Sequence, residues 1–228
     1  MGTRGALGYR LGNQDKVTYN HYDSYPSGLG LDVIKHIRSK DNLDQIKLDF
    51  HQIKLVDEQG IPSQKQIDQC QSSGLISANH NGVDGLGGNR QVDWYVLLRD
   101  TQGDLQKNVD CGFMMDSSEF LADSLFCEWA YIINLDTEFL EIYKGFQKKV
   151  GKGRYAEMTD RSKFVNCDSD YFGVSLVGEL NLVDANDYPL SIISTFLDYV
   201  EANGEIEGTI CLKEPYSGRR LKESYVAQ

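Results

Sequence analysis

The first thirty residues constrain the fold more than any other part of the chain. Two short apolar runs, within residues 6–11 and 17–21, flank the segment Gly12-Asn13-Gln14-Asp15. A Gly-Asn pair between such runs is typical of a β-hairpin, so we expect two antiparallel strands joined by a tight turn. Pro26 then turns the chain, because the residue before a proline is kept out of the α region.

A dense polar and glycine block follows the expected hairpin, with the sequence Tyr19-Asn20-His21-Tyr22-Asp23-Ser24-Tyr25-Pro26-Ser27-Gly28-Leu29-Gly30. Such side chains need partners or water, so we expect a binding site here. Gly28 and Gly30 would leave amides open at a helix start, where the dipole favours an anion. The candidate ligand-binding residues are Arg4, His21, Asp23, Tyr25, Ser27, Gly28 and Gly30.

The same residues also allow a purely structural interpretation. Asp23 would then cap the turn, Arg4 would pair with Asp23, and the tyrosines would pack over the sheet edge. If the second strand continued past His21, then His21 and Asp23 would lie on one face of it, because strand side chains alternate.

The rest of the chain predicts an α+β fold, in which a mainly antiparallel sheet carries packed helices and the amino-terminal hairpin precedes them. Apolar spacing predicts helices over 29–37, from Asp41 or Asn42 to 53, after Pro62, and from Pro189 to Gly204, with a short one over 117–123. We expect strands at residues 94–98, 127–135, 139–143, 171–176 and 206–212. We expect residues 1–228 to form a single domain, with a flexible Gly/Asn-rich loop at 72–90 and a loose tail at 214–228.

Composition excludes several classes of partner. The net charge of −11 disfavours direct nucleic-acid binding, and the basic stretch from Lys144 to Arg154 is interpreted as a solvated loop. No segment approaches the ~18 apolar residues that span a bilayer, and the start lacks a secretory layout, so we expect no membrane contact and a cytoplasmic location. The odd number of scattered cysteines indicates reduced thiols. The oligomeric state stays open.

The motifs of common enzymes are missing. The four histidines lack metal-binding spacing, and no nucleotide-binding fingerprint occurs, so we expect neither a metal nor a cofactor. An amino-terminal nucleophile would suit the strand-turn-strand opening, but removal of Met1 leaves Gly2, which has no side chain to attack with. Thr3 would need a further cleavage. Catalysis is therefore not the leading expectation.

The opening Met1-Gly2-Thr3-Arg4-Gly5 and the block from Tyr19 to Gly30 resemble a group of uncharacterised bacteriophage and bacterial proteins. Their starts read Gly-Thr-Arg-Gly or Cys-Thr-Arg-Gly, followed by Asp-x-Tyr-Pro-Ser-Gly-x-Gly. The resemblance covers residues 1–30, with a weaker likeness over 129–145. The resemblance implies a phage or prophage origin, but it implies no enzymatic reaction. Members that begin with Cys suit an amino-terminal nucleophile, from which Gly2 departs.

The leading hypothesis is a phage-type accessory protein of the host cytoplasm that acts by binding. Its ligand would be a small anion, a nucleotide or a host protein, held at the surface between Arg4 and Gly30. Two alternatives stay open: an amidohydrolase of the amino-terminal-nucleophile type, and a structural component of the virion.

Overall fold

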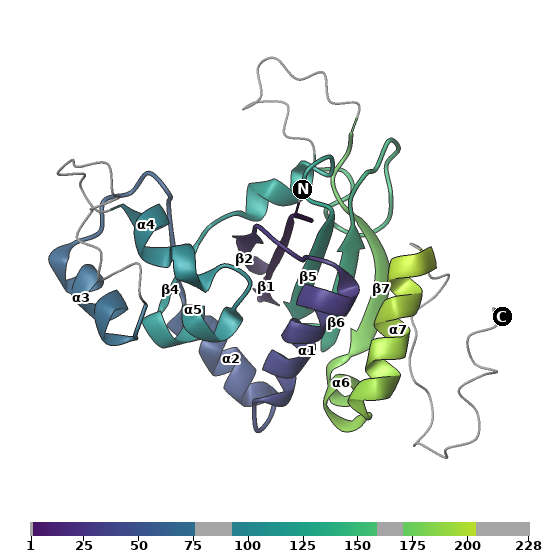
Figure 1. Ribbon diagram of the computed structural model, residues 1–228, viewed down its shortest axis with the longest axis horizontal. Helices are drawn as coiled ribbons and strands as arrows, with labels where there is room; N and C mark the ends of the chain where they lie inside the picture. Colours follow the sequence, from purple (N-terminus) through teal and green to yellow (C-terminus); the bar gives the residue numbers. More distant parts are fainter. Residues whose placement is uncertain (1, 76–92, 159–170, 204–228) are drawn as a thin grey trace.

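A five-stranded, mostly antiparallel sheet carries the fold of the computed structural model, which describes residues 2–75, 93–158 and 171–203 (Figure 1). The strand order is β2-β1-β5-β6-β7, and only β1 and β5 pair in parallel. The strands are β1 (Gly5–Leu11), β2 (Gln14–Asn20), β5 (Trp129–Asn134), β6 (Phe139–Lys144) and β7 (Ser175–Asn181). The predicted α+β class with a mainly antiparallel sheet is confirmed.

The amino-terminal hairpin forms as predicted. Gly12 and Asn13 have φ angles of +59° and +62°, which is the left-handed pair that a tight two-residue hairpin turn requires. Gly5 lies opposite Asn20 in the register, so the start of β1 and the end of β2 meet at one end of the sheet.

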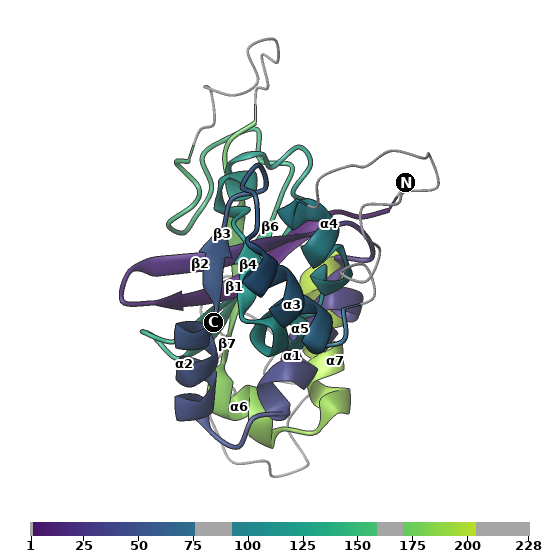
Figure 2. The same ribbon diagram turned by 90° about the vertical axis from the view of Figure 1, so that its left-hand side faces the viewer.

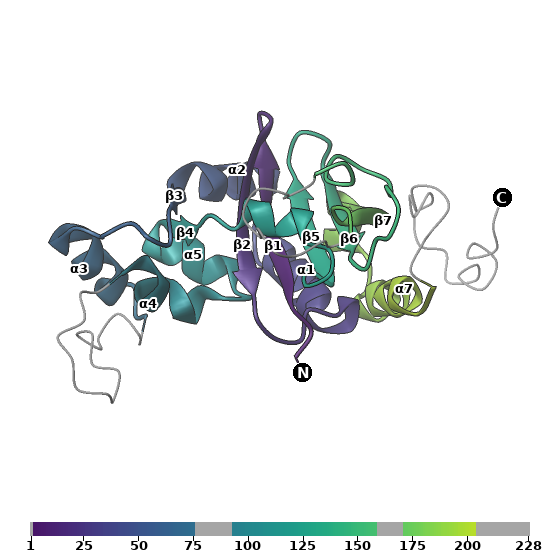
Figure 3. The same ribbon diagram turned by 90° about the horizontal axis from the view of Figure 1, so that it is seen from above.

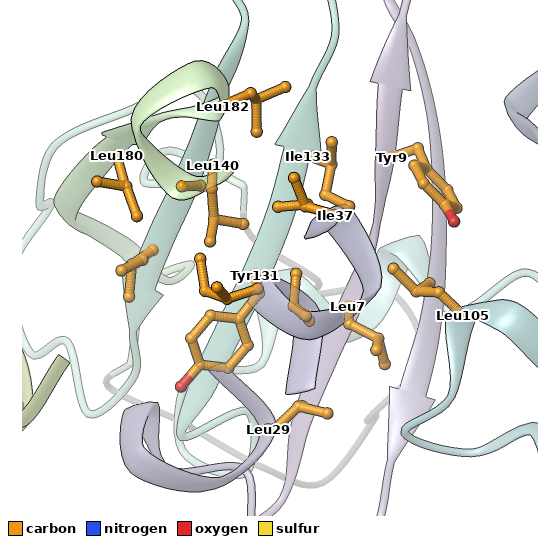
Figure 4. Packing of buried hydrophobic residues seen from close by; sticks show 14 of the residues in the cluster. Leu7, Tyr9, Leu29, Ile37, Leu105, Tyr131, Ile133, Leu140, Leu180 and Leu182 are labelled. Carbon is orange, nitrogen blue, oxygen red and sulfur yellow. The ribbon is translucent and has the colours of Figure 1, made fainter. Parts of the chain in front are cut away.

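Helices cover one face of this sheet. They are the short π-helical turn η1 (Pro26–Gly30), α1 (Leu31–Arg38), α2 (Leu43–Gln52), α6 (Leu182–Asp187) and α7 (Leu190–Asn203). Their apolar residues pack onto alternate side chains of β1, β5 and β6, among them Leu7, Tyr131 and Leu140 (Figure 4). The alternation places this core on one side of the pleat.

The opposite face is covered by η4 (Ser118–Ala122) and by the chain around Tyr155. Ala130 and Ile132 of β5 pack there with Tyr143 of β6. Because both faces are covered, every residue of β5 is buried.

A smaller lobe lies beside β2, at the edge of the sheet opposite β7 (Figure 3), and it stands in front of the sheet when the molecule is viewed from that side (Figure 2). Its parallel pair of strands carries its own apolar core around Trp94 and Phe113. Its elements are β3 (Lys54–Val56), α3 (Gln64–Ser72), α4 (Trp94–Leu98), η3 (Arg99–Thr101), α5 (Leu105–Cys111) and β4 (Phe113–Met115). The backbone N–H of Ser117, just after β4, donates to the Val17 carbonyl at 2.8 Å, which joins the lobe to β2.

All five predicted helices are confirmed, and two strand predictions are corrected. Residues 94–98 form α4, where the Asp93 carboxylate caps the Val96 N–H at 2.8 Å. A short apolar run carries no periodicity that separates strand from helix, and the cap decides here. The strand predicted at 171–176 begins only at Ser175 and continues to Asn181.

Three predictions lie outside the described residues: the strand at 206–212, the tail at 214–228, and residues 76–90 of the loop at 72–90. Within the described ranges, no helix combines the length and the apolar character needed to cross a bilayer.

Candidate functional site

The polar and glycine block forms an elbow, defined as residues 23–30, between the end of β2 and the start of α1. Asp23 adopts a positive φ of +51°, and its carbonyl accepts a hydrogen bond from the Leu29 N–H at 3.1 Å. The N–H groups of Gly28 and Gly30 both donate to the Tyr25 carbonyl, at 3.0 and 3.2 Å. The two amides that we expected to be open to an anion are therefore paired within the elbow.

The elbow does hold one carboxylate, which comes from its own chain. Both the backbone N–H and the hydroxyl of Ser27 donate to Oε2 of Glu201, at 3.2 and 2.8 Å. Glu201 belongs to α7, which packs against η1. Ser27 thus binds an anion, as its position suggested, but the anion is an intramolecular one.

The base of the elbow is sealed around Ser24, which is fully buried. The Ser24 N–H donates to the Thr3 carbonyl at 3.2 Å, and the Ser24 carbonyl accepts from the Tyr131 hydroxyl at 2.9 Å. Asn20 donates to the Ser24 hydroxyl at 2.8 Å. A Cβ on Gly30 would lie 2.9 Å from the Tyr131 ring, so the absence of a side chain lets the elbow close on that ring.

An aromatic row leaves the sheet where β2 ends. The Tyr19 hydroxyl and His21 Nδ1 are 2.7 Å apart, and the His21 and Tyr22 rings meet edge to face at 4.2 Å. Burial raises the pKa of Tyr19, while the nearby Arg4 guanidinium opposes this shift. Since β2 ends at Asn20, His21 and Asp23 are not on one face of a strand.

Arg4 lies beside the chain that precedes β5. Its guanidinium carbon is 5.3 Å from the centre of the Phe126 ring, and its carbonyl accepts the Glu128 N–H at 3.0 Å. No ion pair joins Arg4 to Asp23 or to any other carboxylate of the described residues. Instead, Arg4 extends a surface that we name the N-terminal aromatic surface: Arg4, His21, Tyr22 and Phe126.

The sequence-predicted residues therefore separate into two groups. Arg4 and His21 lie on the N-terminal aromatic surface, and Tyr25, Ser27, Gly28 and Gly30 belong to the elbow, with exposed Asp23 at its start. Sequence reasoning missed Phe126, Glu201 and Tyr131. No local pattern points to these residues, because their contacts with the block join positions far apart in the chain.

A second titratable cluster lies under α1 and was not predicted. His36 Nε2 and the Tyr9 hydroxyl are 2.7 Å apart, and Lys40 Nζ is 2.6 Å from Asp49 Oδ2. Burial first, and then the Lys40 charge, lower the pKa of His36 to about 4, so the imidazole is neutral near pH 7. All four side chains are buried, and they tie β1, α1 and α2 together rather than face a ligand.

The described residues contain no group of three His, Cys, Asp or Glu side chains placed to hold a metal ion. Comparison of the chain with protein-family models, with curated proteins and with solved structures found no match. The chemistry of the N-terminal aromatic surface and of the elbow is therefore the basis on which a function is inferred.

Proposed function

We propose that this chain is a phage-type accessory protein that acts in the host cytoplasm by binding a host protein through the N-terminal aromatic surface. The phage origin follows from the resemblance of residues 1–30. The choice among the three expected ligand classes follows from the elbow, where Glu201 occupies Ser27 and the Gly28 and Gly30 amides are paired. A small anion or a nucleotide would find these groups already used.

One observation carries the proposal: Tyr22 is 64% exposed and Phe126 is 44% exposed, and the segment 2–4 lies against both rings. Large exposed aromatic side chains next to an arginine are the composition of protein-interface hot spots. Arg4 is held over the Phe126 ring by a cation–π contact, so its charge is available at a fixed place.

The amidohydrolase alternative gains no support from the geometry. Thr3, which would be the nucleophile after a second cleavage, is 3% exposed, and its carbonyl is bound by the Ser24 N–H. Intact-mass measurement decides this alternative, because it requires a chain that starts at Thr3.

The proposal is tested by quantitative affinity capture from a bacterial host lysate. Arg4→Ala and Tyr22→Ala are compared with the wild type and with Tyr95→Ala, which removes an exposed tyrosine of the smaller lobe. We expect the same host protein to be lost from both N-terminal variants and retained by Tyr95→Ala. Equal capture by all four folded proteins would remove the proposal.

A second measurement tests the two ligand classes that the proposal sets aside, a small anion and a nucleotide. Inorganic phosphate and ATP are added separately to the wild-type chain, and the melting temperature is recorded. A dose-dependent rise, absent in Ser27→Ala, would return the ligand to the anion class, because a ligand that binds only the folded state stabilises it.

A further inference from the structure

The strongest local departure from the acidity of this chain is the segment 144–154, which we name the basic loop. It contains five cations and no Asp or Glu, in a chain with a net charge of −11. The cations are Lys144, Lys148, Lys149, Lys152 and Arg154. A cluster of positive charges on a negatively charged protein attracts a partner that carries negative charges.

The five cations differ in their availability. Arg154 turns inward, where its guanidinium pairs with both carboxylate oxygens of Glu141, and Lys144 Nζ is 5.1 Å from the centre of the Trp129 ring. Lys148 and Lys149 are exposed, and neither forms an ion pair with a described carboxylate. Lys148 Nζ lies 5.8 Å from the centre of the Tyr171 ring, a cation–π contact that leaves its charge unneutralised. Both ammonium groups can therefore pair with carboxylates of a partner.

Apolar side chains accompany these charges. Phe146 and Val150 are each 51% exposed, on either side of the two lysines in the sequence. A surface that combines exposed aromatic and aliphatic groups with cations suits a partner that carries both carboxylates and apolar side chains.

The backbone holds Phe146 in an unfavourable conformation. Its φ is +60°, in the left-handed region that a bulky L-residue rarely adopts. The Phe146 N–H donates to the Ser124 carbonyl at 2.6 Å, and the Gln147 N–H donates to the Ser124 hydroxyl at 3.0 Å. These bonds fix the turn and leave the ring in solvent. Strain of this kind is typical of functional positions.

The basic loop and the N-terminal aromatic surface lie at the same end of the sheet. The Glu128 N–H donates to the Arg4 carbonyl at 3.0 Å, and the Gly145 N–H donates to the Glu128 carbonyl at 2.8 Å. The chain before β1, the chain before β5 and the chain after β6 are thus neighbours, at the end of the sheet where the N-terminus lies (Figure 1).

We propose that the basic loop docks an acidic, apolar-containing segment of the host protein that the N-terminal aromatic surface binds. Carboxylates of that segment pair with Lys148 and Lys149, and its apolar side chains cover Phe146 and Val150. This inference rests on the proposed function and specifies the chemistry of its partner. Nucleic acid fits less well, because its phosphate backbone would be repelled by the net negative charge of the whole chain.

The probe for this inference is a short labelled peptide of alternating glutamate and leucine, with a glutamine-and-leucine peptide as its control. Fluorescence anisotropy should show binding of the acidic peptide only, and added salt should weaken it. The double variant Lys148→Ala/Lys149→Ala should bind roughly tenfold more weakly, since two exposed charge pairs are lost. The matched control Lys54→Ala/Lys65→Ala removes two exposed lysines of the smaller lobe and should bind like the wild type.

Phe146→Gly separates docking from folding. Glycine adopts a φ of +60° without strain, so the variant should unfold at the same or a higher denaturant concentration. Its affinity for the acidic peptide should nevertheless fall several-fold, because the exposed ring is gone. Unchanged peptide binding by Phe146→Gly and by the double lysine variant would overturn the inference.

Two further outcomes are also decisive. Tighter binding of single-stranded oligo-dT or of phosphatidylserine vesicles than of the acidic peptide would overturn the inference and replace the partner class. In host-lysate capture, loss of the partner by Arg4→Ala but not by the double lysine variant would reject the basic loop alone. Capture that no variant changes would reject the proposed function itself.

Discussion

The carboxylate of Glu201 accepts hydrogen bonds from both the N–H and the hydroxyl of Ser27, a residue 174 positions earlier in the chain. This pair joins α7 to the elbow in the way that a capping carboxylate binds free donors at the start of a helix. The elbow is therefore shaped to receive an anion, and the fold supplies that anion itself.

We expect Glu201→Ala to lower the free energy of unfolding by about 0.5–1 kcal/mol, because charge-assisted hydrogen bonds at an exposed position contribute modestly. Ser27→Ala should cost a similar amount, and the double variant should lose less than the sum, because both changes remove one interaction. Urea unfolding of the four proteins measures this cycle. Strictly additive losses would show that the two residues are not coupled.

Removing the Glu201 carboxylate from the elbow should also change how the chain responds to phosphate. In Glu201→Ala the Ser27 N–H and hydroxyl become free donors, so inorganic phosphate should raise the melting temperature of this variant more than that of the wild type. Ser27→Ala/Glu201→Ala is the control and should show no such gain.

The local parts of the elbow could be predicted from the sequence, and its closure could not. The Gly12-Asn13 turn and the break at Pro26 follow from the conformational limits of single residues. The partners that seal the elbow, Tyr131 and Glu201, lie on β5 and α7, and nothing in residues 1–30 specifies them. The prediction of open amides is wrong for a separate, local reason: the Tyr25 carbonyl accepts both the Gly28 and the Gly30 N–H within the turn itself.

The same limit applies to the rest of the fold. The apolar run Trp94–Leu98 suits a strand as well as a buried helix, and only the Asp93 cap distinguishes them. The parallel pairing of β1 with β5 joins segments more than 100 residues apart, so no turn sequence between the two strands predicts it. By contrast, the Ser63–Gln66 capping box starts α3 from adjacent residues, next to the Pro62 that predicted it.

Gly30→Ala tests how tightly the elbow closes on β5. The new Cβ would lie 2.9 Å from the Tyr131 ring, so the ring must shift and its hydroxyl bond to the Ser24 carbonyl must lengthen. We expect a loss of about 1–3 kcal/mol in the free energy of unfolding. Tyr131→Phe removes only the hydrogen bond and should lose about 1 kcal/mol. If Gly30→Ala unfolds like the wild type, the elbow is looser than its contacts imply.

Lys40→Met tests the buried ion pair under α1. The side chains of Lys40 and Asp49 are 7% and 2% exposed, so removing the ammonium leaves a carboxylate uncompensated in the core. We expect a loss of about 3–5 kcal/mol, whereas Lys40→Met/Asp49→Leu should recover most of it. Chemical denaturation measures both variants. If the double variant is as unstable as Lys40→Met, the instability of Lys40→Met does not come from the uncompensated Asp49 carboxylate, and the ion pair itself stabilises the fold.

His36 should make the stability of this chain depend on pH in the acidic range. Its pKa falls from the ordinary 6.5 to about 4 in the folded state, because burial and the Lys40 charge oppose the imidazolium, although Asp49, Asp104 and Asp110 favour it. Between pH 6.5 and about pH 4 the unfolded chain binds a proton that the folded chain does not, so stability falls as the pH falls through this window. The loss attributable to His36 is at most about 3 kcal/mol and levels off below pH 4, where both states are protonated.

The measurement is urea unfolding at a series of pH values for the wild type, His36→Gln and His51→Gln. His36→Gln cannot take up that proton, so its stability should change less between pH 6.5 and 4, even if it is lower at pH 7 through the altered bond to Tyr9. His51→Gln is the matched control, because it removes an exposed histidine that lies outside the buried cluster. Because the carboxylates act on all three proteins alike, the difference in slope isolates His36. Equal slopes for His36→Gln and the wild type would mean that the imidazole under α1 is protonated as readily in the folded chain as in the unfolded one.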